Sequence, residues 1–148
     1  METNLLLSDL INFSGVNATI VSPAGCDRYD PDLEIIGITS NSNEVKAGFL
    51  FAALHGSNFN GADFVPEAVA RGAVAILIDG TSEVLLKPIT VHAISTDSPR
   101  RLFALMSAKF YRNQPDFIAA VTGTNGKTSV VEFSRQLWAM NGVRSASL

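Results

Sequence analysis

The residues best suited to chemistry form a glycine-rich turn at positions 122–129, which reads TGTNGKTS. Glycines let a backbone fold closely around an anion, and the amide hydrogens at the start of a helix point at phosphate oxygens. Lys127 adds a full positive charge, and the hydroxyl of Thr128 is a suitable ligand for Mg²⁺. The turn therefore predicts a phosphate-binding loop with Thr128 as a metal ligand.

The spacing of this loop is the shorter G-x-x-G-K-[ST], beginning at Gly123, because Val121 stands where the longer pattern has a glycine. A plain glycine turn with a solvated lysine is the structural alternative. The context favours phosphate binding, because an apolar run at 117–121 predicts a strand before the loop and a helical pattern begins near Thr128.

The position of the loop bears on domain organisation. A complete phosphate-loop domain consists of several βαβ units of ~30 residues each, and residues 129–148 are too few for them. We therefore expect the chain to be cut inside its nucleotide-binding domain. The polar segment 112–116 contains Pro115 and predicts the boundary, with one domain at 1–115 and the start of a second at 116–148.

Composition narrows the class of protein. The net charge of −3 gives no broad basic face, so we predict no nucleic-acid partner. Cys26 is the only cysteine, which excludes an internal disulfide. Apolar runs such as 73–78 are too short to span a bilayer, and no signal peptide is evident, so a cytoplasmic protein is expected.

Hydrophobic patterns alternate between helical and strand types, which predicts an α/β fold. Helices are predicted at 4–13, from 62 or 63 to 71, and from 97 or 98 to 111. Strands are predicted at 18–21, 33–38, 49–54, 73–78, 89–94 and 117–121.

Two blocks of the sequence resemble a known family. Residues 33–78, LEIIGITSNSNEVKAGFLFAALHGSNFNGADFVPEAVARGAVAILI, resemble the N-terminal domain of the Mur ligases, and VTGTNGKTS resembles their ATP loop. The combination is most similar to the MurE type, which adds the third stem-peptide residue to UDP-N-acetylmuramoyl-L-alanyl-D-glutamate in peptidoglycan synthesis. The resemblance implies an N-terminal domain with a mostly parallel sheet and flanking helices, followed by a phosphate-loop strand, loop and helix.

The resemblance also implies a reaction and its ligands. The substrate carboxylate attacks the γ-phosphate of ATP, and the amino group of meso-diaminopimelate or L-lysine displaces phosphate from the acyl phosphate. Lys127 is then the catalytic cation, with Mg²⁺ neutralising the phosphoryl group. The ATP-binding residues are Gly123, Thr124, Asn125, Gly126, Lys127, Thr128 and Ser129. The 148-residue chain alone is expected to be inactive.

Carried over by motif, the contacts to the uridine nucleotide (UDP-MurNAc) fall on Ser40, Ser42, Ser57, Asn58 and Phe59. The chain departs from the family pattern with Asn41-Ser42-Asn43 where Asp-Ser-Arg is usual, and with Asn60-Gly61 where Asp-Gly is usual, which removes ion pairs. The resemblance implies that Ser42 and Asn58 line one pocket. The connection between the strands at 33–38 and 49–54 is short for a helical crossover, so an antiparallel hairpin, which would separate the two loops, stays open.

Two other functions remain open. One is the MurF type, which adds D-alanyl-D-alanine; Thr124 favours the MurE type, because serine is more usual there in the MurF type. The other is a non-enzymatic nucleotide-binding module. Folylpolyglutamate synthetase shares the loop but begins near it, and the long segment upstream argues against it.

Overall fold

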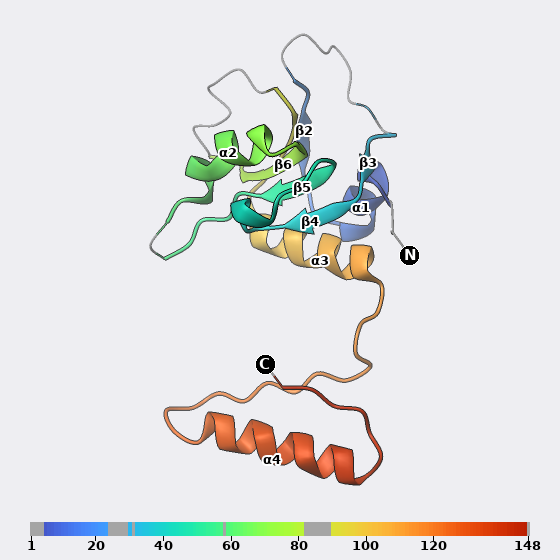
Figure 1. The fold of residues 1–148 in the computed structure, drawn as a ribbon, viewed down its shortest axis with the longest axis vertical. Helices are drawn as coiled ribbons and strands as arrows, with labels where there is room; N and C mark the ends of the chain where they lie inside the picture. The colour runs from blue at the N-terminus through green and yellow to red at the C-terminus, as the bar shows by residue number, and fades with distance from the viewer. Residues whose placement is uncertain (1–4, 24–29, 31, 58, 82–89, 148) are drawn as a thin grey trace. The chain divides into compact units, whose positions relative to one another are not determined.

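The computed structural model describes residues 5–147 except 24–29, 31, 58 and 82–89 (Figure 1). The chain divides into two compact units, Met1–Gln114 and Pro115–Leu148. Cys26 and Asn58 lie outside the described residues.

A five-stranded sheet forms the centre of the first unit, in the order β2-β7-β6-β5-β4. Four strands run parallel, namely β4 (Gly37–Thr39), β5 (Phe49–Ala52), β6 (Ala73–Asp79) and β7 (His92–Thr96), and β2 (Thr19–Val21) is antiparallel to β7. The apolar run AVAILID of β6 is buried almost throughout, as expected for a parallel strand covered on both faces. The predicted α/β fold with a mostly parallel sheet and flanking helices is confirmed.

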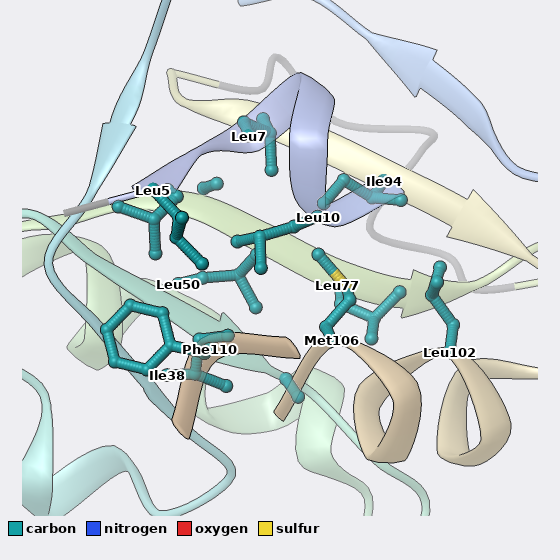
Figure 2. Packing of buried hydrophobic residues seen from close by; sticks show 13 residues of the cluster. Leu5, Leu7, Leu10, Ile38, Leu50, Leu77, Ile94, Leu102, Met106 and Phe110 are labelled. Atoms are coloured by element: carbon teal, nitrogen blue, oxygen red, sulfur yellow. The ribbon is translucent and has the colours of Figure 1, made fainter. Parts of the chain in front are cut away.

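Helices cover both faces of this sheet. Helices α1 (Leu7–Ser14) and α3 (Pro99–Tyr111) lie on one face, and α2 (Val65–Ala70) lies on the other (Figure 1). On the first face Leu10 and Met106 meet Leu50 and Leu77 of the sheet (Figure 2). Because successive strand residues point to opposite faces, Phe51, Ile76 and Ile78 instead pack with the residues of α2.

Helix α3 has the predicted bounds, with Pro99 in its first turn after Ser98. The helix predicted to end at Arg71 is shorter and has a different start. A 3₁₀ turn, η2 (Gly61–Phe64), comes first, and Asn60 caps it with its side chain. Gly72 ends this segment with φ +100°, and a Cβ there would lie 2.8 Å from Ala47 Cα. This position therefore requires glycine.

The strand predicted at 33–38 is two strands in different sheets. β3 (Glu34–Ile35) pairs antiparallel with β1 (Leu5–Leu6), and β4 begins only at Gly37. Between them the amide of Ile36 donates to the carbonyl oxygen of Gly48 (3.1 Å), and the Ile36 side chain is exposed. β1 was not predicted, because two leucines before a helix fit the helical pattern equally well.

Among the described residues 115–147, the second unit contains one helix, α4 (Lys127–Met140). The strand predicted at 117–121 is wrong, because these residues are in neither helix nor strand. A β-strand needs a neighbour for its backbone groups, and no strand is found among residues 115–147. Across the part of the chain that the structure describes, no helix is long and apolar enough to cross a membrane.

Candidate functional site

The parallel pairing of β4 with β5 decides where the two serine-containing loops lie. Ile38 is opposite Leu50 and Thr39 is opposite Phe51, so both strands end at the same edge of the sheet. The crossover between them is a single 3₁₀ turn, η1 (Ser42–Glu44), which is short enough for the connection. The antiparallel hairpin is therefore excluded, and loops 40–44 and 54–61 begin at one edge.

Side chains fix the conformation of the 40–44 loop. Asn41 Oδ1 accepts a hydrogen bond from the amide of Asn43 (3.1 Å). The carboxylate of Glu44 accepts one from Thr39 Oγ1 (3.1 Å) and one from Asn41 Nδ2 (3.2 Å). The amide oxygen of Asn41 thus caps the turn as an aspartate carboxylate does, so the departure at this position leaves the loop fixed.

The two predicted serines of this loop differ in accessibility. Ser40 follows β4 directly and is exposed, whereas Ser42 is only 7% exposed. The structure therefore brings Ser40 to the surface of the sheet edge and places Ser42 in the packed part of the loop.

The 54–61 loop is closed at its neck. The amide of Gly61 donates to the carbonyl oxygen of Leu54 (3.1 Å), His55 and Asn60 form an antiparallel bridge, and the amide of Gly56 donates to Phe59 O (2.8 Å). Asn60 Oδ1 accepts from the amide of Ala62 (3.1 Å) and so fixes the start of η2. These bonds hold Gly56, Ser57 and Phe59 at the edge of the sheet, where they form the tip of the loop.

The tip carries the remaining predicted contacts. Ser57 is exposed, and Phe59 is 71% exposed, an unusual position for a large aromatic side chain. Asn58 is outside the described residues, so its place beside Ser42 stays a prediction. Gly61 is required at the neck, because a Cβ there would lie 2.5 Å from backbone atoms of Ala53 and Leu54.

Two charged residues at this edge were not predicted. Asp79 ends β6 and accepts hydrogen bonds from the amide (2.9 Å) and hydroxyl (2.7 Å) of Thr81, and these bonds, with a smaller effect of the His55 charge, lower its pKa. Arg100, in the first turn of α3, donates from Nη2 to the carbonyl oxygen of His55. No local spacing indicates this second contact, because Arg100 lies on α3 and His55 lies 45 residues earlier, in the 54–61 loop.

In the second unit, the glycine-rich turn has the backbone that its composition predicts. Gly123 has φ +145° and Gly126 has φ +76°, values that side chains disfavour, and Gly126 directly precedes α4. Lys127 Nζ donates to the carbonyl oxygens of Gly123 (2.6 Å) and Thr124 (3.3 Å). The lysine thus folds over its own loop, and Asn125, like Thr128 and Ser129, is exposed.

Comparison with known proteins identifies the family. Residues 34–122 match the model of the Mur ligase family, catalytic domain. The chain belongs to the Mur ligase family. It is 45% identical over 117 residues to a protein of Brucella melitensis biotype 1 and 43% identical over 129 residues to one of Zymomonas mobilis subsp. mobilis. Both relatives are named UDP-N-acetylmuramoyl-L-alanyl-D-glutamate–2,6-diaminopimelate ligase.

The matches cover 79% and 87% of this chain but 24% and 26% of the relatives, so the chain spans about a quarter of their length. Among solved structures, MurF from Acinetobacter baumannii covers 93% of the chain with a TM-score of 0.62 at 22% identity. The match covers 28% of the MurF chain. At that identity the likeness shows that the two Mur ligases share a fold.

Proposed function

We propose that this chain is part of an ATP-dependent ligase of the MurE type, which joins 2,6-diaminopimelate to UDP-N-acetylmuramoyl-L-alanyl-D-glutamate. The observation that carries the proposal is the 43–45% identity to two relatives with that name over most of the chain. It favours diaminopimelate over lysine as the amino acid, and a third-residue ligase over the D-alanyl-D-alanine ligase. An enzyme acting on such a nucleotide precursor is expected in the cytoplasm.

The sheet edge of the first unit is our proposed site for the uridine nucleotide. The exposed Ser40 and Ser57 offer hydroxyls as hydrogen-bond donors and acceptors to the uracil edge and the diphosphate, and Asn58 offers an amide. Phe59 presents an aromatic face on which uracil can stack. Ser42, being nearly buried, supports the 40–44 loop and reaches the ligand only through its small exposed part.

The loop at 122–129 is our proposed ATP site. The two positive-φ glycines give the backbone the close curvature that a polyphosphate needs, and α4 presents the N-terminus of a 14-residue helix. Lys127 holds two carbonyl oxygens that a phosphate oxygen can replace as partners, since an ammonium group forms stronger hydrogen bonds with anions. Thr128 is the ligand that this loop offers to Mg²⁺, and the metal would neutralise charge on the phosphates.

In the proposed reaction the D-glutamyl carboxylate attacks the γ-phosphorus of ATP, and ADP leaves. The amino group of diaminopimelate then attacks the acyl carbon, which forms the amide and releases inorganic phosphate and a proton. Lys127 stabilises the negative charge of the transferring phosphoryl group, because its ammonium lies at the loop that holds the phosphates. The N-terminal unit contributes by anchoring the nucleotide end of the substrate, far from the reacting carboxylate.

Calorimetric titration of the purified 148-residue chain with UDP-N-acetylmuramoyl-L-alanyl-D-glutamate tests the nucleotide site. We expect one-to-one binding that UDP competes with and ATP does not, because the two ligands use different loops. Phe59→Ala should weaken binding by about five-fold or more, the lower end of what an aromatic stacking contact contributes. Phe13→Ala is the matched control, because Phe13 is another exposed phenylalanine, 53% exposed and on α1.

Two outcomes would contradict the proposal. A chain that binds ATP but shows no binding of the uridine nucleotide would favour a general nucleotide-binding module. If Phe59→Ala and Phe13→Ala changed the affinity for the uridine nucleotide equally, the 54–61 loop would not be part of the site.

A further inference from the structure

The 54–61 loop is joined to helix α3 by one side chain. Arg100 Nη2 donates a hydrogen bond to the carbonyl oxygen of His55. The same residue, His55, forms the antiparallel bridge with Asn60 that closes the neck of the loop. The arginine therefore acts on the point from which the tip residues project.

Helix α3 is a firm support for such a contact. Leu102 and Met106 are fully buried against the sheet, and Phe110 is 7% exposed (Figure 2). Pro99 restricts the backbone of the first turn, and the amide of Leu102 closes that turn on Ser98 O (3.0 Å). The packing of α3 thus fixes the backbone of Arg100, and the hydrogen bond from its side chain restricts the position of the 54–61 loop.

The position of Arg100 is not explained by helix stability. The first turn of α3 contains no acidic residue but two arginines, Arg100 and Arg101, and positive charge there opposes the helix dipole. Arg101 is exposed and makes no hydrogen bond or ion pair with another residue of the described chain. The two side chains have the same charge on the same turn, and only Arg100 reaches the loop.

We propose that Arg100 is a positioning residue, which holds the neck of the 54–61 loop on α3 so that Ser57 and Phe59 stay in place for the uridine nucleotide. The inference rests on the nucleotide site proposed above. It adds a residue outside both predicted loops. A charge-assisted hydrogen bond to a carbonyl is among the stronger single contacts available at an exposed site, so its loss should loosen the neck measurably.

The test compares Arg100→Ala with Arg101→Ala in the 148-residue chain, with Arg100→Lys as the conservative variant. The first measurement needs no ligand: amide hydrogen exchange at Gly56 and Gly61, whose amides close the tip and the neck. The second is the dissociation constant for UDP-N-acetylmuramoyl-L-alanyl-D-glutamate. A shared urea midpoint for the variants and the wild type shows that the fold is kept.

Arg100→Ala should speed exchange at both glycines and weaken binding on the order of ten-fold. Arg101→Ala should leave both unchanged within about two-fold, and Arg100→Lys should fall between wild type and Arg100→Ala, since lysine keeps a donor but not the planar fork. If both alanine variants lost protection and affinity equally, the positive charge of the helix turn and not the contact with His55 would be responsible, which overturns the proposal. Faster exchange with unchanged affinity would overturn the positioning role. A wild-type chain that binds no uridine nucleotide would overturn the proposed site, and the exchange measurement would then still decide whether Arg100 holds the loop.

Discussion

Substituting Gly61 by alanine should damage the first unit more than any comparable change in the same loop. A Cβ at Gly61 would lie 2.5 Å from the backbone carbon of Ala53 and from the nitrogen and oxygen of Leu54, nearly an ångström inside the 3.4 Å at which ordinary contact begins. All three atoms belong to the backbone that continues β5, which is paired on both sides. The strand cannot move, so the loop must.

Gly56 provides a matched control. A Cβ there would lie 3.2 Å from Phe59 O and 3.9 Å from Phe59 N, and both atoms belong to the exposed tip, which can yield by a few tenths of an ångström. Alanine also restricts the unfolded chain and so stabilises by about 0.4–1 kcal/mol where it fits. We expect Gly61→Ala to lower the free energy of unfolding by about 1–3 kcal/mol and Gly56→Ala to leave it within about 0.5 kcal/mol of wild type.

Urea denaturation followed by far-ultraviolet circular dichroism measures both values, with the slope against urea checking that the same surface unfolds. Gly61→Ala should in addition weaken uridine-nucleotide binding, because the displaced neck carries the tip with it. Equal midpoints for the two variants would show that the loop does not pack on β5 as described, and the reasoning would then be wrong.

Two further predictions concern the second unit. Lys127→Ala should abolish ATP binding and leave the urea midpoint unchanged, because the Lys127 ammonium is exposed and donates only to carbonyl oxygens of its own loop. Titration calorimetry with MgATP measures the binding, and Lys46→Ala, at another exposed lysine, is the control. Glu132 accepts hydrogen bonds from Arg135 and a further one from Gln136, and these bonds lower the pKa of Glu132 from 4.5 to about 2. The ionised carboxylate therefore stabilises the folded second unit above pH 4.5, and this contribution is lost as the pH falls through about 2. A carboxyl-carbon NMR titration should show a midpoint near pH 2 that rises in Arg135→Met, and a wild-type midpoint near 4.5 would contradict the ion pair.

Elements with a strong local signal could be predicted from the sequence. The uninterrupted apolar run of β6 and the Ser-Pro start of α3 each determine an element without help from distant residues. The required glycines of the phosphate loop also have a local cause, since a positive φ can be inferred from Gly123 and Gly126 in a G-x-x-G-K turn.

The features that could not be predicted depend on contacts between residues that are far apart in the sequence. Residues 117–121 have the apolar composition of a strand, but composition does not supply the neighbouring strand. The direction of β5 relative to β4 was open, because an unforeseen 3₁₀ turn makes the crossover short. Similarly, nothing near Arg100 in the sequence indicates His55 as its partner.

Asn41 and Asn60 keep a backbone contact that their side-chain chemistry allows. Asn41 and Asn60 stand where the family pattern usually has aspartate, so a negative charge is lost at each position. At each turn the side-chain oxygen of the asparagine accepts a hydrogen bond from a backbone amide, as an aspartate oxygen would.

The central claim is that the chain binds a uridine nucleotide at the 40–44 and 54–61 loops and ATP at the loop of residues 122–129. Amide chemical shifts of the 148-residue chain test it most directly, titrated first with UDP-N-acetylmuramoyl-L-alanyl-D-glutamate and then with MgATP. We predict that the first ligand shifts the amides of Ser40, Ser57 and Phe59, and that the second shifts those of Gly123 to Ser129. Shifts of one shared set of amides by both ligands, or none in the 40–44 and 54–61 loops, would contradict the claim.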